Sequence, residues 1–171
     1  FRVAILTSFT LSAIFSITAP KFAGLHGLGD TKELKRVFQM STKMVFWTSI
    51  PVLLTIFLFP SFVLGIFGSA FKEGVFALLI LSFGYFIASI FGSAGYLLQM
   101  TGKQKIYLNI ILIATIINII LNFVLVPVYG INGAALSTLV SMTFAHLLMA
   151  VFVYKIFGFT TIYFPLMKYL L

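Results

Sequence analysis

The chain has 171 residues, of which 61% are hydrophobic and 8% are charged, and its formal net charge is +8 at pH 7. A water-soluble domain of this length has too little interior to bury so much apolar surface. The Lys and Arg residues lie almost entirely between apolar runs and form no basic face interleaved with aromatic residues, which argues against nucleic-acid binding. The sequence contains no cysteine, which excludes disulfides, thiolate metal sites and cysteine nucleophiles.

Five apolar stretches of membrane-spanning length follow one another along the chain. We expect an all-α, polytopic transmembrane helix bundle with spans at about residues 3–19, 44–67, 75–100, 106–127 and 134–157, and the start of a further helix at 165–171. The chain begins and ends inside apolar runs, so we expect residues 1–171 to be a single transmembrane domain that is a fragment of a longer protein.

The first span is expected to end at Pro20 and to be followed by a polar connection from Lys21 to Asp30. Asp30 is predicted to cap the next helix, with Glu33 completing a start that resembles a capping box. Apolar residues then recur at helical spacing opposite a basic side, which predicts an amphipathic helix along the membrane interface. These apolar residues are Leu34, Val37, Phe38, Met44 and Val45.

Prolines and glycines mark the later boundaries. Pro51 and Pro60 should kink or loosen the second span, because each removes a backbone donor. The third span, residues 75–100, is expected to be one helix, and residues 101–105 close it. A tight turn at residues 128–133 should then join the fourth span to the fifth.

The positive charges alternate between the two sides of the predicted bundle. Nine Lys and Arg residues lie in the connections at residues 21–43, 103–105 and 155–168, whereas the other two connections hold only Lys72. Cytoplasmic loops carry an excess of such residues, so the first set should face the cytoplasm. Arg2 then lies near the outer end of the first span.

Small residues repeat every four positions on two spans. They are Gly84, Ala88 and Gly92 on the third span, and Gly133, Ser137, Ser141 and Ala145 on the fifth. Such stripes favour tight helix–helix seams, and a substrate groove lined by the same residues is the alternative.

The sequence argues against an enzyme. Its carboxylates, Asp30, Glu33 and Glu73, all fall in predicted loops and form no acid–base pair, and no histidine cluster or phosphate-binding glycine loop is present. No catalytic residue, metal site or cofactor is therefore predicted.

Polar residues within the spans are the candidates for substrate binding, since each needs a partner or water. Arg2 could face a cavity and attract an anionic headgroup, or extend to the interface. Asn118 and Asn122 share a face with Thr115 and could bond a neighbouring helix or contact a sugar or headgroup. His146 could couple transport to protons, or be a neutral ring bonded to a backbone carbonyl.

The aromatic residues are mostly expected to face lipid. Tyr107, Tyr129, Tyr154 and Trp47 lie close to predicted interfaces and suit an aromatic belt better than a platform that stacks on sugars.

The chain resembles the polysaccharide flippase family in several places. They are residues 100–103, Asn118, Asn122 and the segment 125–138, which contains a proline and the sequence Gly-Ile-Asn-Gly-Ala-Ala. Four further parts of the chain are similar to the same family in the same order, so the resemblance covers essentially the whole chain: residues 1–4, 19–23, 29–30, and 64–68 with Phe71. The chain departs from the family pattern on the third span, at Tyr85 and Ala88, and at His146, where an Asn is common.

The family belongs to the multidrug/oligosaccharidyl-lipid/polysaccharide exporters, which have two helical bundles around a central cavity. The resemblance implies that this chain supplies most of the second bundle and lacks the first. It also implies export of an undecaprenyl-diphosphate-linked oligosaccharide across a bacterial or archaeal inner membrane by alternating access, with Arg2 matching the family's arginine. Implied partners are the bilayer, the lipid-linked oligosaccharide, the missing bundle, and polysaccharide polymerase and ligase machinery.

Two other functions stay open at this point. One is a multidrug or cation antiporter of the same superfamily, which the lack of an intramembrane carboxylate disfavours. The other is a non-transporting membrane scaffold of a biosynthetic complex, which would have a helix interior poor in polar residues. The coupling ion, H⁺ or Na⁺, is not indicated.

Overall fold

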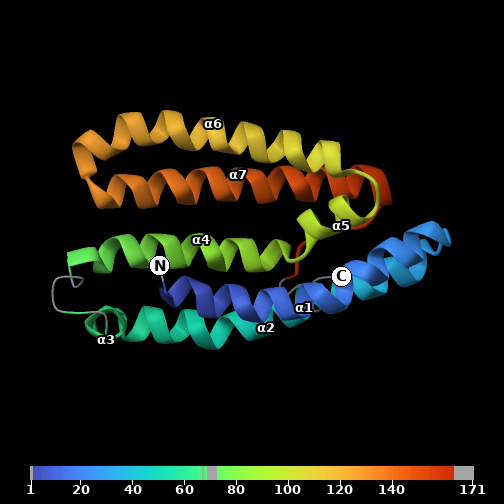
Figure 1. Cartoon of the computed structure of the whole chain (residues 1–171), viewed down its shortest axis with the longest axis horizontal. Coiled ribbons are helices and arrows are strands. Elements are labelled where there is room, and N and C mark those ends of the chain that lie inside the picture. Colours follow the sequence, from blue (N-terminus) through green and yellow to red (C-terminus); the bar gives the residue numbers. More distant parts are fainter. Residues whose placement is uncertain (1, 67, 69–72, 164–171) are drawn as a thin grey trace, which may run out of the picture.

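The computed structural model describes the backbone of residues 2–66, 68 and 73–163, and the side chains of this part from residue 14 onward. The described residues form an all-α bundle, which confirms the predicted class. Its helices are α1 (Arg2–Gly27), α2 (Thr31–Leu58), α3 (Pro60–Gly65), α4 (Val75–Phe91), α5 (Ala94–Met100), α6 (Gln104–Tyr129) and α7 (Ile131–Phe157). Each long helix packs against the next in the series α6, α7, α4, α2 and α1. In the view of Figure 1, α1 is drawn between α4 and α2.

The expectation that the first helix ends at Pro20 is wrong, because α1 continues through Pro20 to Gly27. Phe22 is fully buried and lies 6.2 Å from the Phe38 ring of α2, so packing between helices holds the segment in helical form. The predicted polar connection therefore shrinks to residues 28–30, where Gly29 has a φ of +70°.

The predicted start of α2 is confirmed. The backbone N–H of Glu33 donates to Asp30 Oδ1 at 2.9 Å, so Asp30 caps the helix. The first half of α2 buries Leu34, Phe38 and Val45, whereas Met44 is half exposed.

The two prolines of the second span act differently. Pro51 lies within α2, and the helix continues past it. Pro60 follows a break at Phe59, whose ψ of 49° is not helical, and begins the short helix α3. This difference agrees with the preference of proline for the first turn of a helix and with its restriction on the preceding residue.

The third span is not one continuous helix. The axes of α4 and α5 differ by 52°, and the break falls at Gly92 and Ser93. Gly92 has a φ of +58°, and a Cβ at this position would collide with the Thr42 side chain of α2. The hydroxyls of Ser93 and Ser41 are hydrogen-bonded at 2.8 Å and buried, so contacts with α2 fix the position of the bend.

The hairpin between α6 and α7 is tighter than the predicted turn at residues 128–133. Gly130 alone separates the two helices, with a φ of +55°. A Cβ at Gly133 would meet the Leu125 backbone, and a Cβ at Gly84 would lie 2.8 Å from Met142 Cε. Gly133 and Gly84 therefore lie in tight seams, between α7 and α6 and between α4 and α7. Ala88 and Gly92, from the same stripe as Gly84, line a cavity, as the alternative expectation had it.

Three helices in the described part of the chain, α2, α6 and α7, are long and apolar enough to cross a membrane, and the bent pair α4 and α5 would make a fourth span. The predicted start of a further helix at residues 165–171 lies outside the described residues. The mainly hydrophobic α6 buries few of its side chains, which is typical of a lipid-facing helix.

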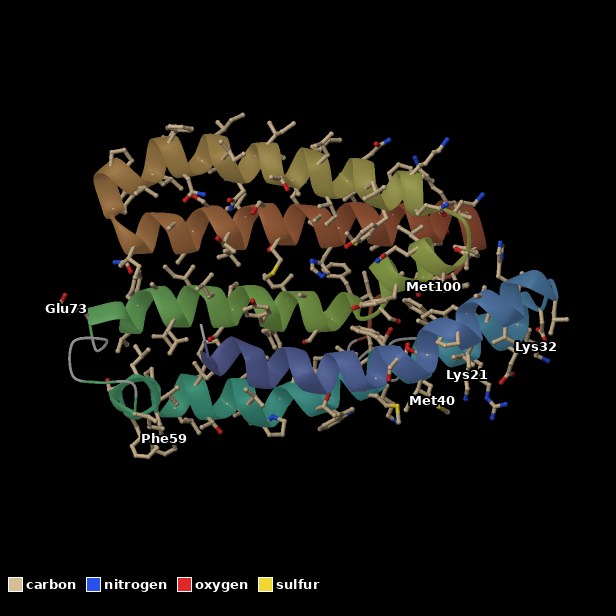
Figure 2. All side chains as sticks on the ribbon, viewed as in Figure 1. Lys21, Lys32, Met40, Phe59, Glu73 and Met100 are labelled. Carbon is tan, nitrogen blue, oxygen red and sulfur yellow. The ribbon has the colours of Figure 1, made fainter. Side chains whose placement is uncertain are left out.

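The two ends of the bundle differ in charge. Lys21 and Lys32 lie at one end of the molecule, and Glu73 and Phe59 lie at the other (Figure 2). For these described residues, the cations lie at the end of the bundle that the sequence predicts to be rich in positive charge.

Candidate functional site

A cavity of about 320 Å³ lies inside the bundle, between α1, α2, α4, α5, α6 and α7. It lies where α4 bends into α5, and Gly92 and Gly95 form part of its wall. A Cβ at Gly95 would lie 3.1 Å from Tyr107 Cε2 and 3.2 Å from Met149 Sδ, so this glycine lets α5 approach α6 and α7 closely. The bend and the two glycines thus shape this space.

The wall of the cavity is aromatic and polar but uncharged. Its lining residues include no Lys, Arg, Asp or Glu. Phe15 and Tyr96 stack with their ring centroids 3.9 Å apart. The polar lining residues are Ser49, Tyr85, Ser89, Tyr96, Gln99, Tyr107 and His146.

Several of these polar groups are already oriented by the backbone. Gln99 Nε2 donates to the Gly95 carbonyl at 3.2 Å, which leaves its side-chain oxygen as an acceptor. Ser89 Oγ donates to the Phe86 carbonyl at 2.7 Å. The site therefore offers neutral donors and acceptors, and it suits binding better than acid–base chemistry.

His146 is the predicted site residue that lines this cavity. Its Nδ1 lies 2.8 Å from the Met142 carbonyl oxygen, so Nδ1 carries the proton and donates it. The bond to a backbone carbonyl expected from the sequence is present, and Nε2 is the ring nitrogen left for another partner. Its ring centroid lies 6.4 Å from that of Phe91.

Asn118 and Asn122 lie in the seam between α6 and α7 and not in the cavity wall. Asn118 Nδ2 donates to Ser141 Oγ at 3.1 Å. Asn122 Nδ2 donates to the Asn118 carbonyl at 2.8 Å and to Asn118 Oδ1 at 3.0 Å. In this conformation Asn118 bonds between helices, the first of the two roles expected from the sequence, whereas Asn122 bonds Asn118 within α6.

Arg2 begins α1, but its side chain lies outside the described residues. Phe15, the α1 residue in the cavity wall, follows it by roughly 20 Å of helix. The four predicted substrate-binding residues are therefore not brought together around one space, and their role as a set stays a prediction.

Sequence reasoning missed most of the cavity wall. The sequence predicts an interfacial position for Tyr107, but this residue lines the cavity, whereas Trp47, Tyr129 and Tyr154 are more than half exposed, as expected. Tyr96 and Gln99 lie four and seven residues after Gly92, a helical spacing that could have indicated a shared face. In the continuous helix predicted for residues 75–100, Tyr96 and Gln99 would point in a different direction, because the structure bends the helix at Gly92.

Comparisons with known proteins agree with a membrane transporter. The family model described as MatE matches residues 1–124. The chain is 34% identical to an uncharacterized membrane protein of Methanocaldococcus jannaschii over 115 residues. The matched part is 67% of this chain and 28% of that protein. No solved structure gives a significant match.

Two further relatives have names that refer to glycans. The probable low-salt glycan biosynthesis flippase Agl15 of Haloferax volcanii is 27% identical to this chain over a segment that makes up 82% of this chain and 30% of the flippase. The capsular polysaccharide biosynthesis protein CapF of Staphylococcus aureus is 29% identical over 90% of this chain and 39% of its own. The chain thus spans less than two fifths of the length of these relatives.

Proposed function

The chain belongs to the MatE family, and from this premise we propose that it forms most of the second bundle of a lipid-linked oligosaccharide flippase. The whole transporter would move an undecaprenyl-diphosphate-linked glycan from the inner to the outer leaflet of a bacterial or archaeal cytoplasmic membrane by alternating access. In this proposal α1 and the broken helix α2–α3 each cross the membrane, so the chain has five membrane spans. A sixth span would begin after residue 164.

The observation that carries the proposal is the uncharged, aromatic cavity at the α4–α5 bend. Sugars present hydroxyl groups together with apolar C–H faces. Tyrosine and glutamine side chains can bond the hydroxyls, and aromatic rings can cover the faces. A cationic drug would be better served by a carboxylate, and none lines this cavity.

The printed names of two relatives support the same substrate class, since one is a probable glycan flippase and the other a capsular polysaccharide biosynthesis protein. Both relatives are much longer than this chain. The first bundle is therefore a required partner in the proposal, and polysaccharide polymerase and ligase machinery are further ones.

We assign roles to the predicted residues within this scheme. His146 and Gln99 contact the glycan from the cavity wall. Asn118 holds α6 to α7 in the conformation seen here, Asn122 bonds Asn118, and both become available to substrate when the seam opens. Arg2 attracts the diphosphate from the first turn of α1.

The proposal is tested with the whole reading frame expressed in a bacterium that lacks its own O-antigen or capsule flippase. Surface polysaccharide and survival in cationic dyes are scored together. We expect restored polysaccharide, its loss on Arg2→Ala, and a drop of about tenfold on Gln99→Leu, which removes a hydrogen-bonding group from the site. Thr115→Val serves as the matched control, because the Thr115 hydroxyl bonds only its own helix and is exposed.

Other outcomes would contradict the flippase. Dye resistance without polysaccharide would indicate a drug antiporter. If neither phenotype appears, cysteines at Gln99 and His146 would be tested with a water-soluble thiol reagent. A cavity that no reagent enters would favour the non-transporting scaffold.

A further inference from the structure

A second cavity, of about 460 Å³, lies on the outside of the bundle between α2 and residues 160–163, which follow α7. Its α2 wall includes Arg36, Gln39 and Lys43, which share one helix face at spacings of three and four. We propose that this cavity binds the phosphate group of an anionic membrane lipid. This inference does not depend on the flippase proposal, because the cavity is separate from the glycan site.

The segment that forms the far wall is held in place at three points. Phe159 is buried, and its ring centroid lies 5.5 Å from that of Phe38. The backbone N–H of Tyr163 donates to the Ile90 carbonyl at 3.0 Å. Trp47 Nε1 donates to the Tyr163 hydroxyl at 3.3 Å. These contacts join the segment to α2 and to α4, and they hold the far wall of the cavity in position.

The polar groups of the cavity suit an anion. Arg36 and Lys43 supply two cations, and no carboxylate is among the lining residues. Thr161 is only 2% exposed, yet its Oγ1 has no hydrogen-bond partner, and it lines this cavity. A buried hydroxyl without a partner is costly, and a phosphate oxygen would accept a hydrogen bond from it.

The ion pair of Arg36 does not occupy the site. Arg36 Nη1 lies 3.6 Å from Glu33 Oε2, and the two side chains are 73% and 42% exposed. Such exposed pairs are weak and are screened by salt. The remaining guanidinium donors stay available to a phosphate group.

The surroundings favour a lipid over a soluble anion. Met40, Met44 and Trp47 continue the face of Arg36 along α2, at spacings of three and four, and each is more than half exposed. Met40 projects outward from α2 on the outer edge of the bundle (Figure 2). A lipid whose phosphate group lies between Arg36 and Lys43 would therefore place its acyl chains beside this apolar strip. The site lies at the cation-rich end of the bundle, which is predicted to be cytoplasmic.

Native mass spectrometry of the full-length protein in detergent tests this site, with phosphatidylglycerol and phosphatidylcholine as probes. We expect preferential binding of phosphatidylglycerol, and a loss of about tenfold in affinity for the Arg36→Gln/Lys43→Gln double variant. Thr161→Val keeps the side-chain shape and should weaken binding about threefold, because it removes only a donor. The matched control is Lys103→Gln/Lys105→Gln, which removes the same charge outside the cavity and should leave affinity unchanged.

Three results would count against the inference. Equal loss in both double variants would show that binding follows overall charge and not this cavity. Equal binding of the two lipids would show that the cavity does not select an anionic lipid over a zwitterionic one. Displacement of phosphatidylglycerol by inorganic phosphate at a similar concentration would retain an anion site but overturn the assignment to a lipid.

Discussion

At the scale of single residues, the polar side chains of α6 and α7 are matched to one another. A polar group inside a membrane bundle needs a partner, and the Asn118 amide finds one in the Ser141 hydroxyl across the seam. Thr115, three residues earlier, is exposed and bonds the Ile111 carbonyl of its own helix at 2.8 Å. Two neighbouring polar residues therefore have different structural roles.

This contrast gives a prediction for stability. Asn118→Leu should lower the free energy of unfolding by about 0.5–1.5 kcal/mol, because it removes an interhelical bond and a partner of Asn122. Thr115→Val should change it by less than about 0.5 kcal/mol, since no contact between helices is lost. Thermal unfolding of the purified protein in detergent measures both, and equal effects would contradict the seam role.

At the scale of elements, glycines decide how closely the helices approach. Gly133 faces the Leu125 backbone, which cannot move aside, whereas Gly84 faces the flexible end of Met142. Gly24 in α1 has no atom within 4 Å of the position of a Cβ. Identical substitutions at these three sites therefore meet different surroundings.

We expect Gly133→Ala to destabilise the protein by about 1–3 kcal/mol through overpacking. Gly84→Ala should cost less, because the Met142 side chain can change rotamer. Gly24→Ala should be neutral or stabilising by up to about 1 kcal/mol, since alanine favours a helix and meets nothing there. A ranking of the three melting temperatures in any other order would contradict the seam geometry.

The bend between α4 and α5 is a second feature at this scale. The Ser41–Ser93 hydrogen bond links the bend to α2, and both residues are nearly inaccessible to solvent. In a double-mutant cycle, Ser41→Ala and Ser93→Ala should show a coupling energy of about 0.5–1 kcal/mol. Ser89→Ala paired with Ser41→Ala is the control cycle, because Ser89 bonds the Phe86 carbonyl of its own helix. Equal coupling energies in both cycles would show that the Ser41–Ser93 hydrogen bond does not specifically join the bend to α2.

At the scale of the whole molecule, Lys21 and Lys32 lie at the end of the bundle opposite Glu73 (Figure 2). The distribution of positive charge predicts an orientation with the start of α6 in the cytoplasm and the α6–α7 hairpin outside. The chain has no cysteine of its own, so single cysteines can report the side directly.

We expect Tyr129→Cys to react with a membrane-impermeant maleimide in intact cells. Gln104→Cys should react only after the cells are permeabilised. Both positions are exposed at opposite ends of α6, so a difference in labelling reflects the side of the membrane and not burial. The reverse pattern would show that the orientation drawn from the positive charges is wrong.

The sequence alone determined the helical class, the approximate helix positions, the Asp30 cap and the separation of charge. These features depend on local periodicity and on nearby residues, which a sequence displays directly. It also identified the Gly84 and Gly133 seams, because a spacing of four marks one helix face.

Only the tertiary structure decided the course of α1 past Pro20, the break at Gly92 and the cavity beside it. Phe22 holds α1 through its packing near Phe38, and Ser93 meets Ser41, which is 52 positions away in the sequence. Such contacts override local preferences, and no window along the chain contains both partners. For the same reason His146 lines a cavity with Gln99, whereas Asn118 joins two helices.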